Sequence, residues 1–540
     1  MSAMDASARL PDRSDATRSA WTPFRDRAFT VLWIATVVSN VGVWMQNAAA
    51  GWLMTGLTAD PFLVSLVQVA TSVPMFLFAL PAGALSDIVD RRRLLIAMQV
   101  VAAVLVAAFG FLVHAGRVTP GVLLAFVAMA GTAAALIMPA WQTIVPQLVP
   151  RTRLQPAVAL NSVGLNISRA IGPALAGLVI TVWGLASPFW VNAATTTGVI
   201  AALIWWHPKE DAAAGRLPPE RFYRAISTGL RHARYNTDLR ATLIRAAGFF
   251  VMASAYWALL PLVARYQIAG GPALYGLLLG AIGAGAVCAA FVLPLLKRYL
   301  GPDRLVAAAV IGTAAAMILF GLARQPPVAL VASVLAGISW ISALATLNVS
   351  AQVALPDWVR GRGLSIFVAA MFGSLTVGSA LWGKVALWAG LSAAHFIAAT
   401  AALVTIPLLW KWKLQTGAAL DLTPSMHWPE PVLAHEVEQD RGPVLVTVEY
   451  LIRPEDRTTF LVALSKLGDE RRRDGAFDWW IFEDVAKPGR FVETFMLDSW
   501  IEHMRQHARV SNTDRELQER VRDFHIQGTP QVTHFVAASS

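Results

Sequence analysis

Charged residues are scarce in this sequence. Of its 540 residues, 14% are charged and 56% are hydrophobic, and the mean hydropathy is +0.54. Soluble globular domains carry about 25% charged residues, so this composition excludes an ordinary soluble protein and places most of the chain in lipid. The charges are also uneven: they fall in short breaks between Phe29 and Leu414, whereas the residues after 440 have the composition of a soluble domain.

Several other features are missing. The single cysteine, Cys288, excludes an intrachain disulfide and gives no support for a zinc site built on thiolates. No GxxxxGK[ST] phosphate-binding loop is present, so intrinsic ATP-driven transport is not expected. Residues 1–23 lack the apolar core of a cleaved signal peptide, and we expect a disordered cytoplasmic tail there. The formal charge of +10 lies mostly in loops beside apolar runs, where membrane orientation explains it without nucleic acid as a partner.

Long apolar runs fill the rest of the chain. A membrane-spanning helix needs roughly 20 apolar residues, and about twelve windows meet that requirement. They lie at 29–54, 62–86, 94–115, 120–142, 158–183, 187–206, 241–266, 273–296, 304–323, 328–351, 363–389 and 392–412. We therefore predict an all-α polytopic membrane protein followed by a small α+β domain.

The basic residues test this count. If the N-terminus is inside, Arg91, Arg92 and Arg93 and most other basic residues fall on one side, and little beyond Arg117, Arg265 and Arg324 falls on the other. Such a bias marks the cytoplasmic side. It predicts an even number of spans in the inner membrane, with both termini in the cytoplasm.

A long connector divides the spans into two sets of six. We expect bundles at 24–206 and 241–414, joined by a cytoplasmic loop at 207–240 with a basic amphipathic segment near Arg221 to Arg234. The sequence FRDRAFTVL around Asp26 is echoed by YNTDLRATLI around Asp238. This favours two repeats related by an axis along the membrane normal, with a chance echo as the alternative.

The stretch GALSDIVDRRRLL interrupts two apolar runs with charge and must reach water. Its glycine, aspartate and arginines are spaced as in the loop between the second and third helices of the major facilitator superfamily, although Ile88 and Asp90 depart from that pattern. The matching positions, which we assign to gating, are Gly83, Asp87, Arg91 and Arg92. Asp87 and Arg91 are four residues apart and can pair if the helix continues between them.

Four further segments resemble the transmembrane secretion effector group of that superfamily, which includes relatives of siderophore exporters and macrolide effluxers. They are NVGVWMQNAAAGWLMT, DIVDRRRLLI, SRAIGPALAG and ALLPLVAR. The resemblance spans residues 22–414 and implies a solute site near the bilayer midplane and transport by alternating access. Gly172 and Pro173 also resemble the helix-five motif of drug antiporters, and we assign them to gating.

Arg169 is the most informative residue of the predicted fifth span. It continues a polar row with Ser162 and Asn166, about 15 Å into the membrane. A charge at that depth costs at least about 2.5 kcal/mol and usually has a function. No aspartate or glutamate at that depth can pair with it, so a carboxylate or catecholate on the solute is one candidate partner. The alternative is a structural lock to helix-end carbonyls.

Other polar and aromatic residues could line the same cavity. Asparagines within lipid usually turn inward and a tryptophan can stack on a flat solute, although such rows also serve as helix-packing contacts. The candidates are Asn40, Trp44, Asn47, Gln68, Asn166, Tyr256, Trp257 and Trp340. The buried carboxylates of a proton antiporter are absent, and we place His395 at the surface near the outer end of its span.

A Pro-rich linker at 415–442 leads to a domain at 443–540 in which the hydrophobic period changes. The strand and helix signals follow the order β-α-β-β-α-β, which predicts a ferredoxin-like unit. This unit resembles the small dimeric barrels of the antibiotic-biosynthesis monooxygenase type, which act without metal or flavin. That resemblance implies Glu493, Trp500, His503 and His507 as ligand or interface residues. We favour a dimer-forming or ligand-sensing role over catalysis, and we expect neither a cofactor nor a metal at His503 and His507.

We therefore predict a secondary transporter that exports an amphipathic small molecule, such as a siderophore or an antibiotic, through the lipid bilayer. Two alternatives stay open. One is an importer or facilitator of the same fold. The other is a membrane-tethered, cofactor-independent monooxygenase with a transport module.

Overall fold

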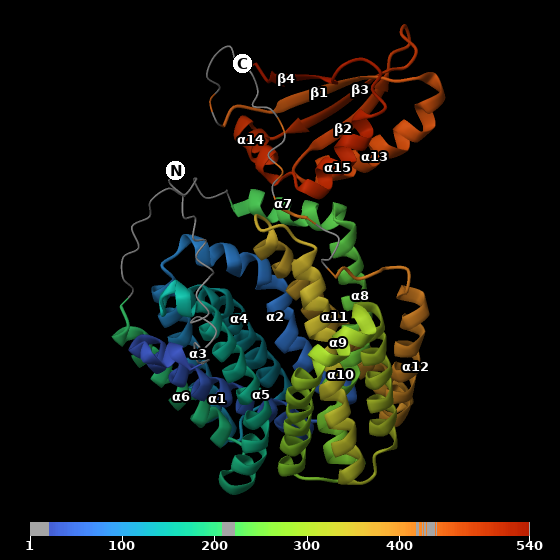
Figure 1. The fold of residues 1–540 in the computed structure, drawn as a ribbon. Coiled ribbons are helices and arrows are strands. Elements are labelled where there is room, and N and C mark those ends of the chain that lie inside the picture. The colour runs from blue at the N-terminus through green and yellow to red at the C-terminus, as the bar shows by residue number, and fades with distance from the viewer. Residues whose placement is uncertain are drawn as a thin grey trace, which may run out of the picture.

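The computed structural model describes residues 21–207, 222–416, 421–423, 425, 428, 438 and 440–538. A bundle of long helices carries a small α+β domain at one end, with helix α7 (Phe222–Tyr235) between the two (Figure 1). We call this end of the bundle the domain side and the opposite end the distal side. The predicted tail and most of the predicted linker lie outside the described residues.

The first half of the bundle holds six long helices: α1 (Arg27–Leu57), α2 (Pro61–Ile88), α3 (Arg91–His114), α4 (Pro120–Ile144), α5 (Leu154–Trp183) and α6 (Ser187–Trp205). The second half holds α8 (Thr237–Leu262), α9 (Pro272–Leu322), α10 (Pro326–Val353), α11 (Arg360–Ala389) and α12 (Leu391–Leu409). Eleven helices in the described chain are long and apolar enough to cross a membrane. Helix α9 bends at Gly301, where φ is +67°, and crosses twice, so the predicted twelve spans are confirmed.

The two halves repeat one local feature at corresponding positions. Thr30 donates its hydroxyl to the Asp26 carbonyl at the start of α1, and Thr242 does the same to the Asp238 carbonyl at the start of α8. Asp26 is further tied to Arg153 by an ion pair of 2.9 Å. The same contact with the carbonyl four residues earlier recurs at Thr71, Thr132 and Thr376, so it does not distinguish a repeat, and the repeat stays a prediction.

Helices α9 and α10 approach so closely that side chains are excluded between them. A Cβ added at Gly337 would strike the Ile282 carbonyl, and one added at Gly285 would strike the Val334 carbonyl. In both cases the obstacle is backbone, which cannot rotate away. Small residues at such crossings let helices pack by dispersion, which is the main attraction available within lipid.

We predict that Gly337→Val costs about 3 kcal/mol or more of stability, because the two helices must separate to admit the side chain. Thermal unfolding of the purified protein in detergent measures the loss. Gly121→Val is the matched control, because no atom lies within 4 Å of the Cβ position there. Equal unfolding temperatures for the two variants would contradict the close approach.

The C-terminal domain has the element order expected from the sequence. Its strands are β1 (Val444–Leu451), β2 (Phe477–Glu483), β3 (Arg490–Leu497) and β4 (Gln531–Val536), and its helices are α13 (Arg457–Arg473), α14 (Trp500–Arg509) and α15 (Asn512–Arg522). All strand pairs are antiparallel and the sheet order is β2-β3-β1-β4. This confirms a small α+β domain, while its likeness to the monooxygenase barrels stays a prediction.

Alternate residues of the two central strands are buried, which gives the sheet one covered face. Phe460 and Leu464 of α13 pack there against Val446 and Phe495 of the sheet, in a core separate from that of the bundle. The domain rests on the second half of the bundle: Arg509 of α14 stacks on Trp358, between α10 and α11, at 4.5 Å from the ring centre. Helix α7, which fulfils the predicted amphipathic segment, contacts α13 on one side and α11 on the other.

Candidate solute site between the two halves

The two halves meet through α5 and α9 and through α2 and α11, and α5 and α9 are in contact near the distal side. A Cβ on Gly177 of α5 would lie 2.7 Å from the Pro272 carbonyl, and one on Gly283 of α9 would lie 2.5 Å from the Ala170 Cα. Gly276 and Gly280 of α9 lie against the carbonyls of Pro173 and Ala170 in the same helix pair. These contacts close the distal part of the interface.

Farther along, the same helix faces are uncovered. Ser162 and Asn166 lie two turns and one turn before Ala170 on α5, and both are exposed. On α9, Phe291 continues the contacting face two turns beyond Gly283 and is 82% exposed. The halves therefore open toward the domain side, and Arg169 lies where the contact ends.

Arg169 and Trp44, both predicted as solute residues, lie together. The guanidinium carbon is 5.0 Å from the centre of the Trp44 ring, within the range of a cation–π interaction. The predicted residue Gly172 permits this approach of α5 to α1, because a Cβ there would lie 2.5 Å from the Trp44 Cβ and 3.0 Å from the Val41 carbonyl. Pro173 is buried in α5 beside it, and its carbonyl borders Gly276 of α9.

Within the described residues, no hydrogen bond or ion pair ties Arg169 to another protein group. Its electrostatic neighbour across the interface is Tyr256 of α8. A charge with one aromatic ring as its contact keeps its hydrogen-bond donors available for a solute.

Three predicted aromatic residues gather on the second half. The ring centres of Tyr256 and Trp257 are 5.7 Å apart, and those of Trp257 and Trp340 are 5.4 Å apart. The indole N–H groups of Trp257 and Trp340 are buried and find no acceptor among the described residues. Buried donors without partners are rare in proteins, and one beside an aromatic cluster indicates a place where a solute or water supplies the acceptor.

The remaining predicted cavity residues are less well placed. Asn166 donates to the Ser162 carbonyl of its own helix, and Gln68 donates to Ser72 one turn along α2. Asn40 is partly exposed and Asn47 is exposed on α1. Because Asn166 and Gln68 satisfy donors locally, the structure does not bring either into the group around Arg169.

The predicted gating motif is divided between two helices. Helix α2 ends at Ile88 and α3 begins at Arg91, so the continuous turn that would align Asp87 with Arg91 is absent. Gly83 lies in the last turns of α2, and the side chain of Asp87 is outside the described part of the chain. Arg92 donates to the carbonyls of Leu203 and Ile204 at the end of α6, which ties it to its own half.

Sequence reasoning missed a set of contacts on the distal side and misplaced one histidine. Arg265, which we had assigned only to a loop, contacts Thr55 and Trp52 of α1 across the two halves. His395 is fully buried instead of lying at the surface, because Leu391 accepts a hydrogen bond from the histidine Nδ1 and the Phe320 ring lies 6.1 Å away. The sequence alone does not determine whether a long aromatic or cationic side chain near the end of a span turns outward or across the bundle.

The four residues predicted in the C-terminal domain lie in its interior. Glu493 is fully buried and accepts hydrogen bonds from the Tyr450 hydroxyl and the Trp479 indole. His503 lies between Trp500 and His507, and its Nε2 is 3.3 Å from that of His507. Burial, together with His507, lowers the pKa of His503 to about 3, so the ring is neutral at physiological pH. Among the described residues no group of three or more potential ligands could hold a metal ion.

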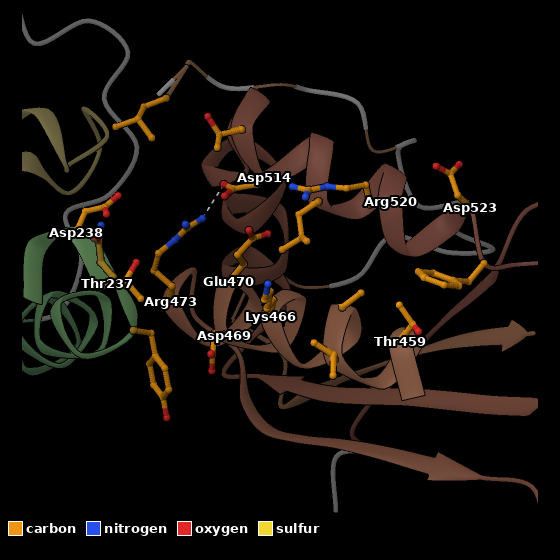
Figure 2. Close-up of a pocket in the computed structure, with 18 of the residues that line it drawn as sticks. Thr237, Asp238, Thr459, Lys466, Asp469, Glu470, Arg473, Asp514, Arg520 and Asp523 are labelled. Atoms are coloured by element: carbon orange, nitrogen blue, oxygen red, sulfur yellow. Dashed lines mark hydrogen bonds and ion pairs between the residues drawn. The ribbon is translucent and has the colours of Figure 1, made fainter. Parts of the chain in front are cut away.

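A pocket of about 970 Å³ separates the domain from the bundle (Figure 2). It is lined by α13 and α15 on one side and by the corner between α7 and α8, which includes Asp238, on the other. Arg473 joins the two domain helices by donating to Asp514 at 2.6 Å. Burial, reinforced by the nearby Asp514, raises the pKa of Glu470 to about 9, so this carboxyl is protonated at neutral pH.

Comparison with known proteins identifies the chain. Residues 18–540 match the family model described as transmembrane secretion effector. The chain belongs to this family of major facilitator transporters. The match includes the C-terminal domain as well as the twelve spans, and it confirms the resemblance inferred from the four sequence segments.

Named relatives within the family are distant. The chain is 23% identical to the staphyloferrin A transporter of Staphylococcus aureus over 267 residues, which are 48% of this chain and 65% of the relative. It is 25% identical to the multidrug efflux pump Tap of Mycolicibacterium fortuitum, over 66% of this chain and 89% of the relative. It is also 25% identical to the enterobactin exporter EntS of Escherichia coli O1:K1, over 66% of this chain and 84% of the relative.

Solved transporter structures share the fold. A POT family transporter crystallised with 5-aminolevulinic acid superposes with a TM-score of 0.60 at 13% identity, covering 72% of this chain and 96% of its own. The nucleoside transporter NupG, as a D323A mutant, gives 0.58 at 14% identity, covering 72% and 99%. The chain is thus a membrane transporter by family and by fold.

Proposed function

We propose that this transporter exports an amphipathic, anionic small molecule by alternating access. The observation that carries the proposal is Arg169, a cation deep between the halves whose contact is a tryptophan ring instead of a carboxylate. An anionic group on the solute would bind the guanidinium, while the aromatic cluster of Tyr256, Trp257 and Trp340 would take its flat apolar part. The relatives named as exporters of enterobactin and as efflux pumps support outward transport.

We further propose that the domain side is cytoplasmic and that the cavity opens to the cytoplasm in this structure. The concentration of arginine and lysine in the loops of the domain side supports this orientation. Closing the domain side while opening the distal side would then release the solute outside the cell. Rocking of one six-helix half against the other about a midplane site is the motion this fold class permits.

The experiment is a flux assay in oriented vesicles. With the domain side outward, as in inside-out vesicles, we expect accumulation of a radiolabelled catecholate such as 2,3-dihydroxybenzoate when a proton gradient is imposed, and little accumulation of 2,3-dihydroxybenzamide. Uptake only in right-side-out vesicles would establish an importer instead. Equal transport of the acid and the amide would reject the role of the anionic group.

The C-terminal domain, in our proposal, does not catalyse a reaction. Glu493 is fully buried, accepts hydrogen bonds from Tyr450 and Trp479 and lies 3.5 Å from Arg471, so these contacts are with side chains of the domain itself and suit a structural role. Oxygen consumption by the full-length protein with quinol or anthrone substrates would instead support the tethered monooxygenase.

We also propose that the domain pairs with a second copy through its uncovered sheet face. Trp480, Phe482 and Phe535 lie on that face and are 62%, 55% and 53% exposed. These residues lie on the two edge strands β2 and β4, and exposed apolar side chains on one sheet face favour burial against a matching surface. We expect Trp480→Glu to convert a dimer to a monomer in native mass spectrometry of the full chain. Val485→Glu, at an exposed position after β2, should leave the dimer intact.

A further inference from the structure

Besides the contacts of α5 with α9 and of α2 with α11, one further group of contacts joins the halves on the distal side. The Arg265 guanidinium donates to the Thr55 hydroxyl of α1 at 3.2 Å and lies 5.0 Å from the centre of the Trp52 ring. The next residue, Tyr266, donates its hydroxyl to the Thr55 carbonyl at 2.8 Å. We call Trp52, Thr55, Arg265 and Tyr266 the distal latch. It joins the first helix of one half to the end of the first helix of the other.

The local backbone explains why both residues of the second half face α1. Residues Val263–Gln267 form a π-helical turn at the end of α8, a rare conformation that often occurs at functional sites. Gln267 anchors this turn to its own half by donating to the carbonyls of Phe320 and Ala323, each at 2.6 Å. With one residue fixed to α9, its two neighbours are presented to α1 of the other half.

The latch is made of contacts that can be broken. Within the described residues Arg265 has no acidic partner, and one of its five N–H donors is used. Thr55 is oriented to accept, because its own hydroxyl proton goes to the Trp52 carbonyl at 2.7 Å. An anion holds a guanidinium more firmly than a hydroxyl and an indole do, because a carboxylate or phosphate can accept two parallel hydrogen bonds and carries the opposite charge, whereas the Thr55 hydroxyl accepts one.

Arg265 also repeats the arrangement at Arg169. Each guanidinium lies 5.0 Å from a tryptophan ring of α1, Arg169 at Trp44 and Arg265 at Trp52. The two tryptophans are eight residues apart, which is about 12 Å along the helix axis. A solute leaving the deep site toward the distal side would therefore meet a second cation with unused donors.

We propose that Arg265 is a second anion-binding residue on the exit path, and that an anionic group which draws it away from Trp52 and Thr55 opens the distal side. This inference rests on the proposed export of an anionic solute. The solute would then open its own exit, because the contacts that keep the gate shut and those that bind the anion use the same guanidinium.

Spin-label distances test the latch in the full chain in lipid nanodiscs. In a Cys288→Ser background, labels at Ala115→Cys and Ala389→Cys report the separation of the halves on the distal side, since both positions are exposed there and lie on opposite halves. We expect Arg265→Gln to raise the ratio of open to closed molecules about tenfold without solute, because a cation–π contact and a hydrogen bond are lost. Arg324→Gln is the control, since Arg324 contacts Gly321, Ala323 and Ser392 within its own half.

Saturating 2,3-dihydroxybenzoate tests the anion site. The acid should shift the unsubstituted protein toward the open state, and 2,3-dihydroxybenzamide should not. In Arg265→Gln, the acid and the amide should have the same effect on the ratio of open to closed molecules. Arg265→Lys, which keeps the charge, should retain the response to the acid and serves if the glutamine variant does not fold. An unchanged resting ratio in Arg265→Gln would overturn the latch, and a preserved difference between acid and amide in that variant would overturn the anion site. The affinity of Arg169→Gln for 2,3-dihydroxybenzoate, measured by calorimetry, tests the deep site separately.

Discussion

Arg169→Gln should lower export of an anionic solute by about 10- to 100-fold, which corresponds to the loss of one charge-assisted hydrogen-bond pair worth roughly 1.5–3 kcal/mol. The substitution keeps most of the side-chain volume and the polar end, and it removes the charge. The packing of α5 against α1 depends on Gly172, which is untouched. We therefore expect correct insertion and near-normal thermal stability alongside the loss of flux in vesicles.

Two comparisons separate binding from a structural lock. Arg169→Lys keeps the charge but loses the planar stacking on Trp44, so partial transport of the acid should return. Trp44→Phe keeps a ring under the guanidinium and should be mild. If Arg169→Gln transports normally, no charge is required at this position. If the variant loses flux and melts well below the unsubstituted protein, Arg169 acts mainly by locking α5 to its neighbours.

The course of the chain through the membrane was predictable from sequence. Twenty apolar residues between charged breaks have one solution in lipid, a helix, because every backbone donor and acceptor must be satisfied within the segment. The amphipathic helix α7 followed from the pattern of charge in the central connector. In the C-terminal domain, strand alternation and the Pro454 helix start predicted the element order that the sheet confirms.

The partners of individual side chains were less predictable. Spacing on one helix placed Arg169 in a polar row with Asn166, but its contact proved to be Trp44 on another helix, through an approach that Gly172 allows. The Asp87–Arg91 pair stays a prediction, because the side chain of Asp87 lies outside the described part of the chain. In the sequence, Arg265 differed from the other basic residues only in being one of the few that fall on the side opposite the cytoplasm. Such contacts depend on how two helices cross, and hydrophobic period alone does not contain that information.

The second large expected effect concerns the joint between the domain and the bundle. Glu470 of α13 lines the pocket of Figure 2 and is faced by Asp514 of α15 and by Arg473 and Asp474. Burial and Asp514 raise the pKa of this carboxyl to about 9, far above its ordinary value of 4.5. The folded domain therefore keeps a proton that the unfolded chain releases above pH 4.5. The free energy of unfolding should fall as the pH rises toward 9, by at most about 1.4 kcal/mol per pH unit.

The histidines have the opposite sign, which sets the window for the test. Burial lowers the pKa of His503 to about 3 and also lowers the pKa of His534, so the unfolded domain binds protons below pH 6.5 that the folded domain does not bind. Stability from these groups is lost as the pH falls through 6.5 and is complete above it. The domain should accordingly be most stable near pH 6.5, and the range from 7.5 to 8.5 isolates Glu470.

Glu470→Gln should remove the decline between pH 7.5 and 8.5 and make the domain more stable at pH 8.5, because an amide fills the same site without a proton to lose. Pulse proteolysis of the full-length protein in urea measures the fraction of folded domain at each pH. Glu516→Gln on the exposed face of α15 is the matched control and should keep the slope of the unsubstituted protein. A decline that persists in Glu470→Gln would place the titrating group elsewhere, with Asp474 the next candidate, since burial raises the pKa of that carboxyl as well.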